Sequence, residues 1–187
     1  KASGVLTHGG SVANLTALAA ARAAIAPDAW TDGNPNDLVV IGAASAHYSI
    51  ARALSILGLG KKAFYPVAVD KNEVLLIEDL PRVYAKAIAD GKRVMCVVAN
   101  ACATSTGLFD PIDAMGDFCQ EKNLWFHVDG AHGAAALAGP QSKQYVKGIE
   151  KARSLIWDAH KMMRVPALCT AVLFRDFKDQ AAAFQQQ

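Results

Sequence analysis

Short apolar runs alternate with helical segments along the whole chain, and this alternation limits the folds that are available. Apolar runs of about four to eight residues are typical of buried strands, whereas apolar positions that recur near every 3.6 residues are typical of helices. Parallel strands need a crossover connection, usually a helix, so the alternation predicts an α/β fold with a mostly parallel sheet and helices on both faces. We expect strands near 5–7, 38–42, 63–69, 94–99, 124–129, 154–157 and 169–175, and helices over 12–26, 50–57, 76–90, 112–122 and 176–187.

The composition fits one ordinary domain or part of a larger protein. Of the 187 residues 52% are hydrophobic and 19% are charged, which is enough for a sizeable core. The net charge is +2 with interspersed signs, and every apolar run is interrupted before it could span a bilayer, so we expect neither a nucleic-acid nor a membrane partner. The four cysteines lack Cys-x-x-Cys spacing, which predicts reduced thiols, no metal site and a cytoplasmic location.

A lysine between apolar residues is the most unusual chemical feature of the chain. Lys161 lies between His160 and two methionines, shortly after an apolar run. Burying an ammonium is costly, so such a lysine either extends to solvent past its neighbours or loses its charge, for example in a Schiff base with an aldehyde. Taken alone, the pattern favours a surface lysine. Other polar residues of the chain, taken together, favour the Schiff-base interpretation.

A glycine pair opens the alanine-rich helix predicted over residues 12–26. Gly9, Gly10 and Ser11 precede this helix, and Ser11 is its expected N-cap. Free amides and the positive end of the helix dipole would attract an anion, and glycine would let a phosphate approach the backbone. The competing interpretation is an ordinary turn and cap, which such sequences form more often.

Three further candidates follow predicted strands, where open parallel sheets bind ligands. His47 follows the strand near 38–42, Thr104 follows the strand near 94–99, and Asp129 ends the strand near 124–129. His47 could contact a ligand or cap a helix, and Asp129 has the same two possibilities. Because all the candidates fall at strand ends or at a helix start, we expect one ligand site at one edge of the sheet.

A phosphorylated heteroaromatic aldehyde would use every one of these groups. Its phosphate would bind the amides of the glycine turn, its aldehyde would react with Lys161, and its protonated ring nitrogen would pair with Asp129. His47 would stack on the ring. A Ser-His-Asp hydrolase fits less well, because the chain lacks the Gly-x-Ser-x-Gly motif.

Four blocks together resemble the group II pyridoxal-phosphate-dependent amino-acid decarboxylases. This family includes the glutamate, cysteine-sulfinate, diaminobutyrate and aromatic amino-acid decarboxylases. The blocks follow the family's order and span nearly the whole chain, and the His-Lys-Met-Met run with Cys169 is closer to the glutamate and cysteine-sulfinate branch. They are Thr-His-Gly-Gly-Ser-Val-Ala-Asn at 7–14, Ser-Ala-His-Tyr-Ser at 45–49, His-Val-Asp-Gly-Ala at 127–131 and Asp-Ala-His-Lys-Met-Met at 158–163.

The resemblance implies the aspartate-aminotransferase fold, type I, of pyridoxal-phosphate-dependent transferases. Its large domain holds a seven-stranded sheet with one antiparallel strand, expected here at 169–175. The implied catalytic residues are Lys161, which would form the Schiff base, His160, His47 and Asp129. The implied contacts of pyridoxal 5'-phosphate are Gly9, Gly10, Ser11, His47, Thr104, Asp129, Ala131, His160 and Lys161.

The implied activity is decarboxylation of an L-amino acid to the amine and carbon dioxide, in a homodimer with the active site at the subunit interface. We expect residues 1–187 to be the central cofactor-binding domain of a longer protein, without its N-terminal segment and C-terminal small domain, and such a segment alone may be inactive. Two alternatives stay open. One is another type I enzyme, either an aminotransferase or a lyase, and the other is a non-catalytic fragment.

Several positions depart from the usual family pattern. Gly130 stands where relatives have alanine, His132 where they have tryptophan or tyrosine, and Ala159 where they have proline. Residues 102–104 read Cys-Ala-Thr where Gly-Thr-Thr is usual, so a cofactor-contacting hydroxyl would be lost or moved to Thr104. Asp158 replaces an asparagine that some relatives carry, and its charge would repel a phosphate unless it points away.

Overall fold

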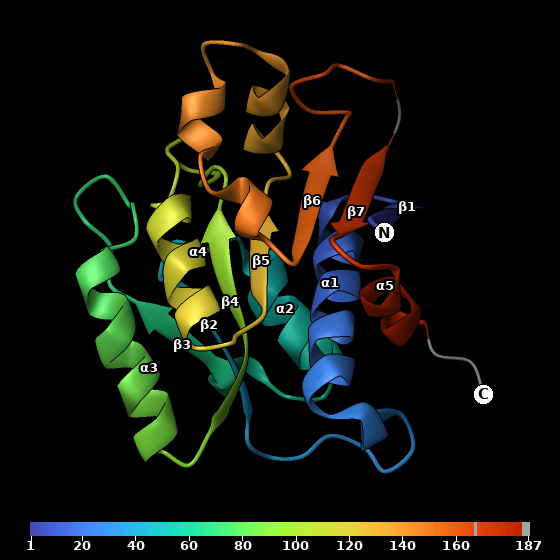
Figure 1. Ribbon diagram of the computed structural model, residues 1–187, viewed down its shortest axis with the longest axis vertical. Coiled ribbons are helices and arrows are strands. Elements are labelled where there is room, and N and C mark those ends of the chain that lie inside the picture. The colour runs from blue at the N-terminus through green and yellow to red at the C-terminus, as the bar shows by residue number, and fades with distance from the viewer. Residues whose placement is uncertain (167, 185–187) are drawn as a thin grey trace.

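A seven-stranded sheet forms the centre of the computed structural model, which describes residues 1–166 and 168–184. Its strand order is β1-β7-β6-β5-β4-β2-β3 (Figure 1), and β7 is antiparallel to both of its neighbours. The other neighbouring pairs are parallel. This confirms the predicted sheet and its antiparallel strand. The strands are β1 (Ser3–Thr7), β2 (Leu38–Ala43), β3 (Phe64–Val67), β4 (Arg93–Asn100), β5 (Phe126–Asp129), β6 (Ser154–Asp158) and β7 (Thr170–Phe174).

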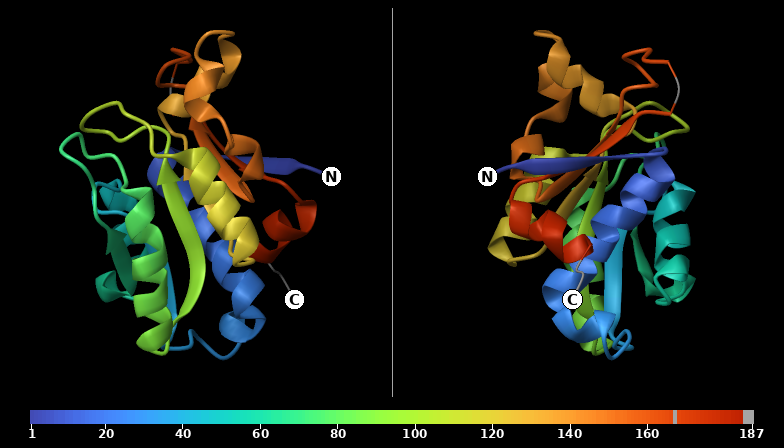
Figure 2. Two further views of the ribbon diagram at one scale, coloured as in Figure 1. Left: turned by 60° about the vertical axis from the view of Figure 1, so that its left-hand side comes forward. Right: turned by 90° about the vertical axis from the view of Figure 1, so that its right-hand side faces the viewer.

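Helices cover both faces of the sheet, as the alternation predicts. One face carries α1, α2 and α5, and the other carries α3 and α4 (Figure 2). The helices are α1 (Gly10–Ile25), α2 (Tyr48–Ile56), α3 (Leu80–Ala89), α4 (Ile112–Glu121) and α5 (Phe177–Ala183). Short 3₁₀ turns occupy Pro27–Trp30, Lys61–Ala63, Ile77–Asp79, Gly133–Ala138, Lys143–Val146 and Ile149–Lys151.

Helix ends differ from the predicted ones where caps and prolines decide them. Ser11 is not the N-cap of α1, because the helix already begins at Gly10 and Gly9 takes the cap position without a side-chain bond. The helix expected over 76–90 becomes a 3₁₀ turn followed by α3, which has a proline in its first turn. Of the helix expected over 176–187, residues 185–187 lie outside the described part of the chain.

The core lies between the sheet and its two helical layers. Every residue of β2 and β5 is buried, and so is all of β4 after Arg93, which explains why β2 and β4 read as nearly continuous apolar runs. The face of α1 toward the sheet is built from alanines such as Ala13, Ala17 and Ala20, so this helix packs close to the strands. Within the described residues, no helix combines the length and the hydropathy needed to cross a membrane.

The strand ends that carry the candidate residues meet at one edge. Asn100 of β4 pairs with Asp129 of β5, and Asp129 pairs with Ile156 of β6, so these three strands end at nearly the same level. Helices α1 and α2 begin at this edge, at the top of the sheet in Figure 1. The fold therefore brings strand ends and helix starts together, as open parallel sheets do.

Candidate active site

A cavity of about 240 Å³ lies at the carboxyl edge of the sheet. Apart from Gly9, which directly precedes α1, every candidate residue predicted from the sequence lines it. The cavity combines strand ends, two helix starts and the turn after β6. It is lined by Gly10, Ser11, Asn14, His47, Tyr48, Asn100, Cys102, Thr104, Asp129, Ala131, His132, Asp158, His160 and Lys161.

The start of α1 provides the backbone groups for an anion. Gly9 has φ 95° and ψ 158°, a conformation open almost only to glycine, and no side chain caps the helix. The first amides of α1 therefore have no side-chain acceptor, and the helix dipole adds partial positive charge. A Cβ placed on Gly10 would lie 3.2 Å from Oδ2 of Asp158, so glycine keeps the cavity open here.

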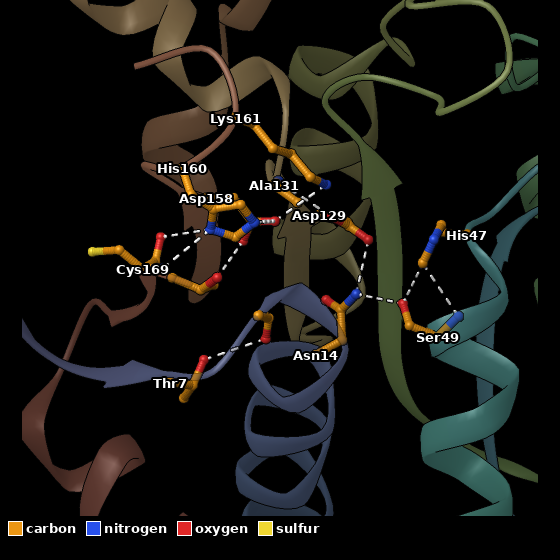
Figure 3. Close-up of polar contacts among 12 residues, drawn as sticks. Thr7, Asn14, His47, Ser49, Asp129, Ala131, Asp158, His160, Lys161 and Cys169 are labelled. Atoms are coloured by element: carbon orange, nitrogen blue, oxygen red, sulfur yellow. Dashed lines mark hydrogen bonds and ion pairs between the residues drawn. The ribbon is translucent and has the colours of Figure 1, made fainter. Parts of the chain in front are cut away.

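His47 fills both roles considered for it, because it caps α2 and also lines the cavity. Its Nδ1 accepts a hydrogen bond from the backbone N–H of Ser49 at 3.3 Å and lies 2.8 Å from the Ser49 hydroxyl (Figure 3). A backbone N–H can only donate, so Nδ1 carries no proton. The proton of neutral His47 is therefore on Nε2.

Asp129 is held by two donors at the end of β5. Its Oδ2 accepts a hydrogen bond from Nδ2 of Asn14 at 2.8 Å, and its Oδ1 accepts one from the backbone of Ala131 at 3.2 Å. Donated hydrogen bonds stabilise the charge of a carboxylate that is only 8% exposed. The next helical turn begins only at Gly133 and has His132 at its N-cap, so Asp129 is not a helix cap.

Lys161 is partly exposed, as the local pattern taken alone favours. Its side chain is 39% exposed, and Met162 and Met163 beside it are exposed as well. Its Nζ lies 3.1 Å from Oδ2 of Asp158, whose side chain is 1% exposed (Figure 3). The Thr170 hydroxyl donates to the other oxygen of Asp158 at 2.7 Å. The carboxylate thus lies next to Gly10, but a cation and a hydroxyl compensate its charge.

His160 is fixed by the backbone of Cys169, which directly precedes β7. Its Nδ1 lies 3.1 Å from both the N–H and the carbonyl oxygen of Cys169, so this backbone can satisfy either tautomer of the ring. The other ring nitrogen, Nε2, lies 3.6 Å from Oδ2 of Asp158. The ring therefore lies between the Cys169 backbone and the carboxylate that pairs with Lys161.

The sequence analysis missed the buried polar residues behind the cavity. Asn14 lies four residues after Gly10 and so shares its face of α1, while His127 lies two residues before Asp129 and so shares its face of β5. His127 Nε2 and Asn14 Oδ1 are 2.9 Å apart. Burial lowers the pKa of His127 to about 4, so the ring is neutral near pH 7. Helical and strand periodicity are the signals that could have identified both residues.

The surroundings of three departures from the family pattern can now be described. A Cβ on Gly130 would lie 2.7 Å from Cβ of Ala134 and 2.8 Å from the carbonyl oxygen of Ile156, so alanine does not fit here. His132 and Thr104 both line the cavity, which places a ring and a hydroxyl next to the Cys102–Ala103 segment.

The residues present fit a phosphorylated pyridine aldehyde. The helix start offers amides to a phosphate, Lys161 offers an amine and Asp129 offers a carboxylate. In addition, the buried Nδ2 of Asn100 has no hydrogen-bond partner among the described residues, and Asn100 lines the cavity. Over the same part of the chain, no three His, Cys, Asp or Glu side chains gather as a metal site would require.

Comparisons with known proteins agree with this chemistry. The whole chain, residues 1–187, matches the family model described as the pyridoxal-dependent decarboxylase conserved domain. It is 36% identical to cysteine sulfinic acid decarboxylase of Mus musculus over 92% of this chain and 36% of that protein. It is 34% identical to a mouse acidic amino acid decarboxylase over 94% of this chain and 32% of the relative. The chain thus spans about a third of the length of these relatives.

Solved structures show the same fold. The crystal structure of mouse CSAD superposes with a TM-score of 0.96 at 34% identity, covering 100% of this chain and 40% of that one. The glutamate decarboxylase domain of a Vibrio parahaemolyticus diaminobutyrate enzyme superposes with a TM-score of 0.94 at 30% identity, over 100% of this chain and 42% of that one. These matches confirm both the resemblance and the type I fold inferred from the four blocks.

Proposed function

The chain belongs to the pyridoxal-dependent decarboxylase family, and we propose that it is the cofactor-binding part of an enzyme that removes the α-carboxylate of an L-amino acid as carbon dioxide. Pyridoxal phosphate is the cofactor of this family. The observation that carries the proposal is the convergence of Lys161, Asp129, His47 and the start of α1 on one cavity. These groups come from four distant parts of the chain, and they match the needs of the cofactor one by one.

Each part of the cofactor has a partner in the cavity. The amides of Gly10 and Ser11 would hold the phosphate, and the amine of Lys161 would bind the aldehyde carbon. The carboxylate of Asp129 would keep a proton on the ring nitrogen, and the ring of His47 would pack on the cofactor ring. When bound, pyridoxal phosphate supplies an electron sink for the electron pair left by the departing carbon dioxide.

Two basic groups of the chain would handle protons near the reacting carbon. Nε2 of His160 faces the Lys161–Asp158 pair, so His160, with a proton on this nitrogen, would be the donor that protonates the product. Lys161 would return to its ammonium form beside Asp158 when it is released. Proton transfer between placed side chains contributes about 10²- to 10⁴-fold to typical rates.

The relatives give a first substrate class. They are named as decarboxylases of cysteine sulfinic acid and of acidic amino acids, so an acidic L-amino acid is the first substrate to assay. The runner-up is another type I reaction, either transamination or a lyase reaction. Product analysis separates the two, because only decarboxylation releases carbon dioxide and the amine in equal amounts.

Two further proposals concern the assembly and the location of the whole protein. We propose a homodimer whose second subunit completes the site, because two large, exposed apolar side chains lie beside the cavity: Tyr48 lines it and Met162 directly follows Lys161. Sedimentation of the full-length protein tests this proposal. A cytoplasmic location is proposed from the four free cysteines, and fractionation of cells tests it.

Borohydride trapping of the full-length protein tests the function. Pyridoxal phosphate is added, the absorbance spectrum is recorded, the protein is reduced and the labelled peptide is identified by mass spectrometry. We expect the adduct on Lys161, no adduct in Lys161→Ala and a wild-type adduct in Lys147→Ala, a matched surface lysine that pairs with Asp113. An adduct on another lysine, or multiple turnovers by Lys161→Ala, would contradict the assignment.

A further inference from the structure

A continuous chain of buried hydrogen bonds runs along the α1 face of the sheet, from Trp125 just before β5 to the cavity. The indole N–H of Trp125 donates to the hydroxyl of Ser154 at 2.8 Å, and that hydroxyl lies 2.8 Å from Nδ1 of His127. On the other side of its ring, His127 contacts the side-chain oxygen of Asn14 at 2.9 Å. Each of these four residues is at least 96% buried. We call Trp125, Ser154, His127 and Asn14 the indole-to-amide chain.

The carboxylate of Asp129 sets the direction of the bonds in this chain. A carboxylate can only accept, so Asn14 presents Nδ2 to Asp129 and Oδ1 to His127. Oδ1 needs a donor, so the ring proton of His127 is on Nε2, and because burial keeps the ring neutral, Nδ1 accepts from the Ser154 hydroxyl. The Ser154 oxygen in turn accepts from the indole N–H of Trp125, which can only donate.

The orientation of the Asn14 amide then decides which hydrogen bonds reach Asp129 directly and His47 through Ser49. With Oδ1 facing His127, both protons of Nδ2 are donated forward, one to Asp129 and one to the Ser49 hydroxyl, each at 2.8 Å (Figure 3). The Ser49 hydroxyl in turn donates to Nδ1 of His47. If the amide were rotated by 180°, its oxygen would face the carboxylate of Asp129, which would be repulsive.

We propose that His127 and Asn14 are positioning residues that orient Asp129 and His47 together through the direction of this hydrogen-bond chain. The inference rests on the proposed function, in which Asp129 and His47 are the partners of the cofactor ring. It adds that the two groups, one on β5 and one at the start of α2, share a single amide. Neither His127 nor its hydroxyl and indole partners line the cavity.

The test compares variants of the full-length protein by their affinity for pyridoxal phosphate and by the absorbance spectrum of the bound form. Asn14→Leu and His127→Leu each break the chain with an apolar side chain. We expect each to weaken affinity about tenfold or more, the scale of a lost hydrogen bond to a charged group. Because the two residues act in series, the double variant should lose no more than the worse single variant.

Two controls separate orientation from stability. In His127→Gln, an amide N–H can replace the ring donor, so we expect most of the affinity to return. Cys119→Ala opens a small space under α4, on the opposite face of the sheet from the indole-to-amide chain, and should lower thermal stability without changing affinity or spectrum. Equal losses in Cys119→Ala and His127→Leu, or additive losses in the double variant, would overturn the inference.

A measurement on the wild-type protein reports the position of the ring proton directly. Nitrogen NMR of histidine-labelled full-length protein, assigned by the signal lost in His127→Gln, should show the proton of His127 on Nε2 and none on Nδ1. A proton on Nδ1 would overturn the inference. If the wild-type protein forms the adduct on Lys161 and the Asn14 and His127 variants bind pyridoxal phosphate as tightly as wild type, the inference is wrong and the proposed function stands. If no adduct forms on any lysine, both the proposed function and the inference are wrong.

Discussion

The ammonium of Lys161 lies 3.1 Å from Oδ2 of Asp158, a carboxylate that is almost wholly buried. Asp158 also accepts a hydrogen bond from Thr170, so its two oxygens face a cation and a hydroxyl. The candidate reactive lysine is therefore one half of an ion pair and not a free amine. Since an amine must give up its proton before it attacks an aldehyde, Asp158 should influence how fast the site takes up its cofactor.

Asp158→Asn should speed the uptake of pyridoxal phosphate several-fold. Asparagine keeps the shape and can still accept the Thr170 hydroxyl, but it no longer holds the Lys161 ammonium by charge or repels a phosphate near Gly10. Rapid-mixing absorbance of the full-length protein measures the rate. Asp113→Asn, at a surface ion pair, is the matched control and should behave as wild type. Slower uptake in Asp158→Asn would contradict this explanation.

Gly10→Ala should weaken pyridoxal phosphate binding without destabilising the cofactor-free protein. The added methyl would lie 3.2 Å from Asp158 and would narrow the proposed phosphate site, while alanine favours the helix by about 1 kcal/mol. Gly9→Ala is the contrasting variant, because nothing lies within 4 Å of its Cβ but φ is +95°. It should cost about 1 to 3 kcal/mol of stability. Absorbance titration and thermal unfolding separate the two effects.

Gly130→Ala restores the usual family residue and should nevertheless destabilise this protein. The new methyl would lie 2.7 Å from Ala134 and 2.8 Å from both Leu155 and the carbonyl oxygen of Ile156. Such overpacking costs about 1 to 3 kcal/mol. The free energy of unfolding in urea measures it. Unchanged stability would mean that the backbone near Gly130 adjusts easily.

The stability of the cofactor-free protein should fall as the pH drops from 6.5 to about 4, partly because of His127. Burial lowers the pKa of this ring from 6.5 to about 4, so in that window the unfolded chain binds a proton that the folded chain rejects. The contribution of the neutral ring is complete above pH 6.5 and is lost at up to about 1.4 kcal/mol per pH unit below it. Urea unfolding across this range should show a shallower slope for His127→Gln.

The sequence was most informative about the strands and helices and least informative about hydrogen bonds between residues that lie far apart in the chain. Strands β2 and β4 are buried on both faces, so their apolar runs identify them directly. Asn14 and His127 also lie at positions whose periodicity is visible in the sequence. Their contact depends on α1 lying over β5, which no local pattern encodes because 113 residues separate the two side chains.

Lys161 shows a second limit. Its apolar neighbours left a surface lysine and a buried, uncharged one both open, and the exposure is decided by the turn that carries it, in which the neighbouring methionines are exposed too. Its ion pair with Asp158 is local, three residues apart, and could have been proposed from the spacing alone. Burial by tertiary neighbours was the part that local sequence could not supply.

The pairing of β1 with β7 has a consequence for the order in which the protein is made. β1 directly precedes the helix start proposed to hold the phosphate, and its only sheet neighbour is β7. A ribosome must therefore release the chain through Phe174 before the first strand can dock, and such long-range pairing is slow. Loading of the cofactor should accordingly follow synthesis of this whole region, and nascent chains that stop before β7 should not retain pyridoxal phosphate.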